Sequence, residues 1–135
     1  MSMFKIFDVS GSAASAQTQR LNVVASNVAN ADTLEGPNGE RYKARQVVFQ
    51  TLMMGEATSA GVQVSQVVED ESAGRSVYSP THPKANAEGN VVYSNVNAIE
   101  EMVNMISASR SYQNNIEVMN TAKSLLLKTL QMGQS

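Results

Sequence analysis

The strongest constraint on the fold is a heptad pattern near the C-terminal end of the chain. Asn97 precedes it and Glu100 follows three residues later, which is the arrangement of a helix capping box. The pattern predicts one long helix from Ala98 to about Met132, with a coiled-coil seam along one side. Seven of its nine positions are apolar, and the nine are Met102, Met105, Ser109, Tyr112, Ile116, Met119, Lys123, Leu126 and Leu130.

Such a helix is too long to be enclosed by a domain of this size. At 1.5 Å per residue it measures roughly 50 Å, whereas a compact chain of 135 residues has a radius of gyration of about 14 Å. We therefore expect the helix to project and its seam to need a partner helix. The nearest candidate is the segment from Phe4 to Ala31, where apolar residues also recur every seven positions. These residues are Phe7, Ala14, Leu21 and Val28.

The N-terminal helix has two unusual features. Gly11 disfavours helix by roughly 1 kcal/mol relative to Ala, so we expect the regular helix to begin after it. Between Leu21 and Ala31 there is no charged residue, and the polar positions are Ser and Asn. Such side chains can be buried against another protein at less cost than ions if their hydrogen bonds are satisfied. Two helices of this kind favour an antiparallel pair that packs further into a multi-chain bundle.

The middle of the chain, residues 34–96, has a different pattern. The stretches "YKARQVVFQTL" and "GVQVSQVVED" are rich in β-branched residues, and "NVVYS" is a third short strand candidate. Gly-Pro and Asn-Gly within residues 33–40, and two prolines within residues 79–90, indicate loops. The predicted fold is therefore mainly α with a small β element. Two helical segments, residues 1–33 and 97–135, form an antiparallel coiled-coil domain around a central β-hairpin and loop region.

Several function classes are disfavoured by composition. A net charge of −2 and 5% aromatic residues give no reason to expect nucleic-acid binding. The chain has no cysteine and one histidine, His82, and the acidic run Glu69–Glu71 lacks the ligand order of an EF-hand. The longest aliphatic run, Leu125–Leu127, is far too short for membrane insertion, and no apolar segment of a cleavable signal peptide develops near Met1. We expect no catalytic residue, no metal site and no cofactor.

Two stretches of the chain resemble bacterial flagellar rod and hook proteins. The first is "SGSAASAQTQRLNVVASNVANADT", residues 10–33, which is similar to their N-terminal signature. The second covers residues 81–133 and contains "THPKANAEGNVVYSNVN" and "MISASRSYQNNIEVMNTAKSLL", which are similar to the C-terminal half of one member. Residues 34–80 are less distinctive.

This resemblance implies a structural subunit of the basal-body rod. Proteins of this family polymerise helically into the drive shaft that transmits torque from motor to hook. The resemblance implies a periplasmic location and export through the flagellar type III apparatus without a cleaved signal. It also implies contacts with copies of itself and with other rod proteins. The residues expected at subunit contacts are Leu21, Asn22, Ser26, Asn27, Val28 and Asn30, followed by Met102, Met105, Tyr112, Ile116, Met119, Leu126 and Leu130.

Two other functions remain open at the level of the sequence. A coiled-coil adaptor or secretion chaperone would form a stable soluble dimer with protected helices. A small hydrolase using His82 would lose activity on His82→Ala, although no nucleophile and base pair supports it.

Overall fold

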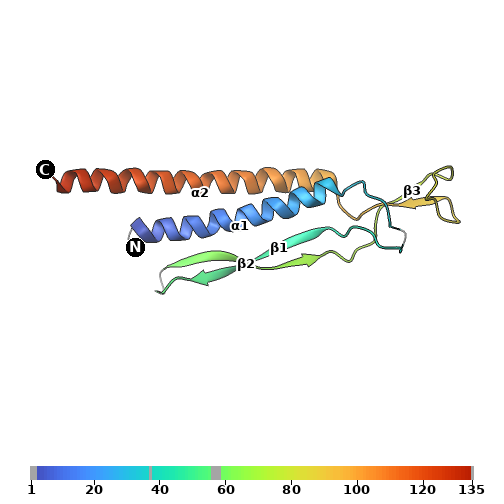
Figure 1. The fold of residues 1–135 in the computed structure, drawn as a ribbon, viewed down its shortest axis with the longest axis horizontal. Coiled ribbons are helices and arrows are strands. Elements are labelled where there is room, and N and C mark those ends of the chain that lie inside the picture. Colours follow the sequence, from blue (N-terminus) through green and yellow to red (C-terminus); the bar gives the residue numbers. More distant parts are fainter. Residues whose placement is uncertain (1–2, 37, 56–58, 135) are drawn as a thin grey trace.

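The computed structural model describes residues 3–36, 38–55 and 59–134. The molecule is elongated, and both chain ends lie at the same end of it (Figure 1). Helix and strand are mixed as predicted, with two terminal helices and small antiparallel sheets between them. The elements are α1 Met3–Ala29, β1 Arg45–Met53, β2 Ala60–Glu69, β3 Ser76–Tyr78, β4 Asn90–Val92 and α2 Ala98–Gly133.

Helix α2 begins where the sequence predicts. The side chain of Asn97 accepts hydrogen bonds from the backbone N–H groups of Ile99, at 3.1 Å, and Glu100, at 3.3 Å. Two acidic residues in the first turn, Glu100 and Glu101, also favour the positive end of the helix dipole. At 36 residues the helix is roughly 54 Å long. It exceeds α1, which has 27 residues, and runs past the start of α1 (Figure 1).

Helix α1 lies between α2 on one side and the β1–β2 hairpin on the other (Figure 1). It passes through Gly11 without a break, so the expectation that it begins after Gly11 is wrong. Packing on two sides outweighs the modest helix preference lost at one glycine. The buried residues of α1 are mostly small, which lets both neighbours approach closely; they are Ser10, Ala14, Ala16, Val24 and Asn27. Packing within the chain therefore explains the lack of charge at these buried positions of α1.

The predicted β-hairpin is confirmed. Strands β1 and β2 pair antiparallel from Arg45↔Glu69 to Met53↔Ala60, with a register shift between Val48 and Phe49. A two-stranded ribbon is marginally stable alone, and α1 anchors it near both ends. Near the turn, the backbone N–H of Val62 donates to the Ser12 hydroxyl at 3.1 Å. Near the open end, Asn27 bonds to the backbone of Arg45.

A second small sheet, β3–β4, lies at the opposite end of the molecule from the chain termini (Figure 1). Strand β4 corresponds to the predicted "NVVYS" segment, whereas β3 was not predicted because three residues show no periodicity. Residues between these strands form the predicted turns, with Gly89 at a φ of 82° that favours glycine. A small core of Ala31, Ala44 and Val96 connects this region to the helices. In the predicted 33–40 loop, Pro37 lies outside the described residues.

Candidate assembly interface

The side of α2 that faces α1 is lined by small or polar residues. Its buried positions are Glu101, Ala108 and Ala122. Each of them lies one residue before a residue of the predicted seam. At these three points the prediction of which α2 residues pack against α1 is therefore wrong by one position. Alanine at 108 and 122 lets two small-sided helices approach more closely than methionine or lysine would.

The predicted heptad seam instead runs along a flank of α2. Met105, Ile116, Met119 and Leu126 are half-buried, whereas Met102 is 53% and Leu130 55% exposed. Tyr112 also lies among the exposed large hydrophobic residues. Packing against α1 therefore covers only part of the predicted seam. A 3.5-residue period of apolar residues is typical of a helix that is covered by another helix.

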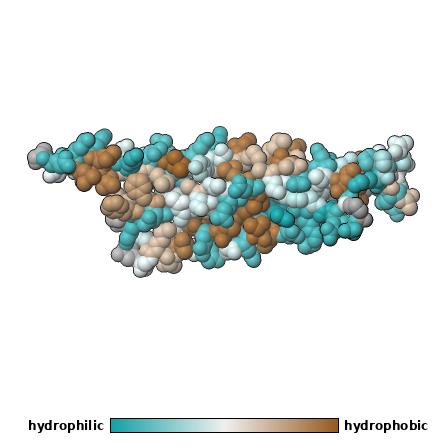
Figure 2. Space-filling model, in the orientation of Figure 1, coloured by the Kyte–Doolittle hydropathy of each residue, from teal (hydrophilic) through white to brown (hydrophobic). Residues whose placement is uncertain are grey.

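Two further apolar surfaces of α2 are uncovered in the single chain. At the start of the helix, a base patch is formed by Ile99, Met102, Val103 and Ile106, all more than half exposed. Beyond the start of α1, the free end of α2 exposes Leu125, Leu127, Leu130 and Met132. Figure 2 shows hydrophobic surface gathered over both regions of the helix. Large exposed apolar surfaces on a protein of this size indicate contacts with other molecules.

Asn27 forms a junction between three elements inside the chain. Its Nδ2 donates to the carbonyl of Arg45, at 2.8 Å, and to Oε2 of Glu101, at 3.1 Å. Its Oδ1 accepts from the Tyr42 hydroxyl, at 2.8 Å, and from the Arg45 N–H, at 3.0 Å. The residue is 0% exposed. The expectation that Asn27 contacts another subunit is therefore corrected, because its amide is fully used in joining α1 to β1 and α2.

The other residues of α1 that the sequence predicted at subunit contacts differ in how far they are buried. Ser26 shares a hydrogen bond of 3.1 Å with the Tyr42 hydroxyl, and Asn30 donates to the Ser26 carbonyl at 2.9 Å. Leu21 and Val28 are half-buried, and Asn22 is exposed. Of the predicted set on α1, Asn22 is thus the residue most available to another chain.

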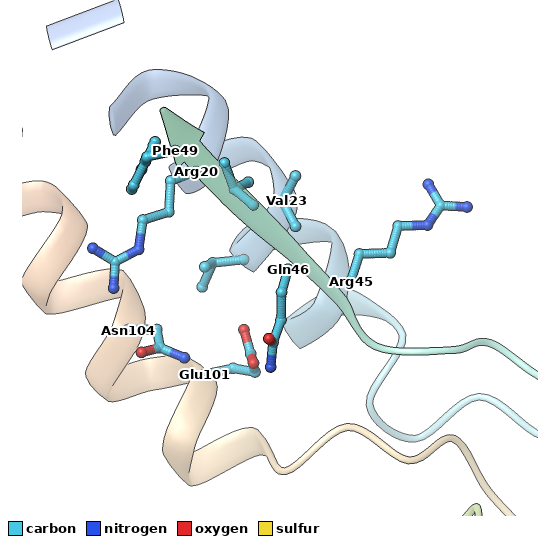
Figure 3. A pocket seen from close by; sticks show the side chains of 9 residues that line it. Arg20, Val23, Arg45, Gln46, Phe49, Glu101 and Asn104 are labelled. Carbon is cyan, nitrogen blue, oxygen red and sulfur yellow. The ribbon is translucent and has the colours of Figure 1, made fainter. Parts of the chain in front are cut away.

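A cleft of about 460 Å³ opens between β1 and the start of α2 (Figure 3). Arg20 reaches into it from α1, while Gln46, Glu101 and Asn104 form its polar side and Phe49 its apolar side. Arg45 points away and forms an ion pair with Glu69 at 3.6 Å. No local pattern in the sequence marks Glu101, because it resembles an ordinary exposed acid in the first turn of a helix. Within the part of the chain that the structure describes, no group of three acidic or histidine side chains could hold a metal ion.

Charged groups cluster around the region where the β segments meet the helices. The Glu71 carboxylate accepts from Lys43 Nζ at 2.7 Å, and this hydrogen bond raises the pKa of Lys43. The Ser72 N–H donates to Asp70 Oδ1 at 2.8 Å and lowers the pKa of that carboxyl. Both shifted groups are exposed, so these contacts contribute little to stability. His82 lies in a turn, where its Nδ1 accepts from the Lys84 N–H at 3.1 Å.

Neither helix, over its described residues, is apolar enough along its length to cross a bilayer.

Family models and similar proteins agree on the family to which this chain belongs. A family described as "Flagella basal body rod protein" matches residues 7–34, and one described as "Flagellar basal body rod FlgEFG protein C-terminal" matches residues 87–132. The flagellar basal-body rod protein FlgC of Yersinia enterocolitica is 55% identical over 99% of this chain and 100% of its own length. The chain belongs to the FlgC family.

Further FlgC relatives give the same result. The protein of Salmonella typhimurium strain LT2 is 52% identical, and that of Buchnera aphidicola from Acyrthosiphon pisum is 47% identical, each over 99% of this chain and its own full length. Since FlgC proteins are structural, this chain is a structural subunit of the flagellar basal-body rod and not an enzyme. The hydrolase hypothesis for His82 is therefore wrong. The relatives also cover residues 34–80, where the sequence motifs were weakest.

Proposed function

We propose that this rod subunit polymerises helically through its terminal helices, and that neighbouring subunits cover the flank of α2. The observation that carries the proposal is the heptad seam. Its apolar residues recur over four heptads, yet Met102, Tyr112 and Leu130 remain exposed in the single chain. A helix from a neighbouring subunit lying along this flank would bury them in coiled-coil fashion.

The contacts assigned to this interface are the uncovered or half-covered members of the predicted set. On α2 they are Met102, Met105, Tyr112, Ile116, Met119, Leu126 and Leu130, and on α1 they are Leu21, Asn22, Ser26, Val28 and Asn30. Residues 1–33 and 97–135 would form the coiled-coil domain of the rod wall, with residues 34–96 beside it. Torque would then be spread over many long helix contacts, which suits a stiff shaft between motor and hook.

Membership of the FlgC family supports two further parts of the proposal. The partners would be copies of this chain and the other rod proteins. The chain would reach the periplasmic rod through the flagellar type III export apparatus, without a cleaved signal. The soluble adaptor or chaperone that the sequence left open is set aside, because the FlgC relatives and the rod family model make this chain a structural rod subunit.

The decisive experiment places a charge in the seam. Ile116 is half-buried on the flank, so Ile116→Asp would bury an unpaired carboxylate once a neighbouring helix covers it. In a flagellated strain whose own copy is deleted, we expect this variant to be exported but absent from purified basal bodies, and the cells not to swim. Ser107→Asp, at an exposed position on another side of α2, is the matched control and should restore swimming.

Normal swimming of the Ile116→Asp strain would contradict the proposed interface.

A further inference from the structure

Methionine is frequent on the flank of α2 that assembly is proposed to cover. Three of the nine seam residues are Met102, Met105 and Met119. In the free chain they differ in their access to solvent, because Met105 and Met119 are half-buried, whereas Met102 is 53% exposed. Methionine is flexible and polarisable, so it packs well against irregular apolar surfaces. A methionine that is exposed in the free subunit and buried after assembly is accessible to an oxidant only before assembly.

Met102 lies where oxidation would affect the flank most. It is the first residue of the seam, and its neighbours Val103 and Ile106 are also exposed. No charged residue occurs from Met102 to Ser109, so the proposed contact is apolar here. Oxidation of the thioether gives a sulfoxide, which is polar and disrupts apolar interfaces that contain methionine. Burial of the sulfoxide oxygen without a hydrogen-bond donor carries a cost in free energy that the thioether does not have.

We propose that Met102 is an oxidation-sensitive residue that controls incorporation of this subunit. A peroxide transfers one oxygen atom to the sulfur of Met102. The O–O bond breaks, an S–O bond forms, the sulfur loses two electrons, and the peroxide is reduced to water or an alcohol. The oxidised chain then binds poorly through the flank of α2. The proposal rests on the proposed function, because it describes the regulation of that same interface.

Met53 provides a matched control within the same chain. It is 61% exposed, close to the value for Met102. It lies on β1, however, and α1 separates this strand from α2 (Figure 1). We therefore expect a peroxide to oxidise both residues, and only the change at Met102 to weaken the flank contact. The comparison separates an effect at the flank from a general effect of oxidation on the chain.

Hydrogen peroxide treatment followed by peptide mass spectrometry tests the accessibility of these residues. In the purified free chain we expect Met102 and Met53 to be oxidised at similar rates, and both faster than Met105 and Met119, since susceptibility follows exposure. In purified basal bodies the oxidation of Met102 should be at least about tenfold slower than in the free chain. Equal rates for Met102 in the free chain and in basal bodies would overturn the proposal.

Glutamine substitution tests the effect on assembly, because glutamine has a similar length to methionine and carries a polar oxygen, as the sulfoxide does. In a strain whose own copy is deleted, we expect Met102→Gln to lower the amount of chain in basal bodies by at least about tenfold. The controls Met102→Leu and Met53→Gln should be incorporated normally.

Normal incorporation of Met102→Gln would refute the role of Met102. The Ile116→Asp strain then separates the two levels of the account. If Ile116→Asp is absent from basal bodies while Met102→Gln is present, the flank contact stands and only the oxidation-sensitive role fails. If both variants are incorporated, the proposed function fails as well.

Discussion

At the scale of single residues, Asn27 has the most demanding role in the fold. It makes four hydrogen bonds, to Tyr42, to Glu101 and to both backbone groups of Arg45. The partners lie on β1, on α2 and, in the case of Tyr42, in the loop before β1. Removing the side chain leaves several of these groups unpaired, and each unpaired buried group costs about 1–3 kcal/mol. The absence of charge at position 27 itself therefore reflects internal burial.

We predict that Asn27→Ala lowers the free energy of unfolding by about 2–4 kcal/mol. Asn22→Ala, at an exposed position of the same helix, should change it by less than about 0.5 kcal/mol. Urea unfolding of the purified chains, followed by circular dichroism, measures both. Equal midpoints for wild type and Asn27→Ala would show that the junction does not hold the three elements together.

At the scale of elements, α2 has faces with opposite requirements. The face of α2 that packs against α1 needs small side chains, because the two helices leave no exposed surface around residues such as Ala108, which is 0% exposed. The flank is only partly covered by the chain, and the base patch and the free end carry large apolar side chains that are mostly exposed. In the single chain, substitutions on the first face should therefore affect stability much more than substitutions at the exposed positions.

A pair of substitutions tests this division. Ala108→Leu should destabilise the chain by about 1–3 kcal/mol, because a larger side chain does not fit between α1 and α2. Leu130→Ser should leave stability within about 0.5 kcal/mol of wild type, since Leu130 is largely exposed near the free end of α2. Thermal and urea unfolding measure both variants. A large loss for Leu130→Ser would mean that the free end of α2 is packed within the chain.

Much of this arrangement could be predicted from the sequence, and the exceptions have physical reasons. The helix cap at Asn97, the length of α2 and the two hairpin strands follow from local patterns. The face that α2 turns toward α1 could not be predicted, because a heptad pattern identifies apolar positions but does not say which partner covers them. Asn27 was assigned to a contact between subunits for the same reason. Its partners Tyr42, Arg45 and Glu101 are distant in sequence, and nothing local indicates that they meet.

At the scale of the whole molecule, the chain is an elongated stack in which α1 is covered on two sides and α2 on one. This asymmetry is the central claim, because it makes α2 the element that assembly completes. Local stability should follow it. Backbone amides in well-covered elements open rarely, whereas those in a helix with few tertiary contacts exchange readily.

Hydrogen exchange of the free chain and of the chain in purified basal bodies tests this claim most directly. In dilute solution we predict that amides of α2 beyond Leu125 exchange much faster than those of α1 between Ser10 and Asn27. In basal bodies the same α2 amides should become at least about 100-fold more protected, which corresponds to roughly 2.7 kcal/mol of added local stability. Equal protection of the α2 end in the free chain and in the rod would contradict the account.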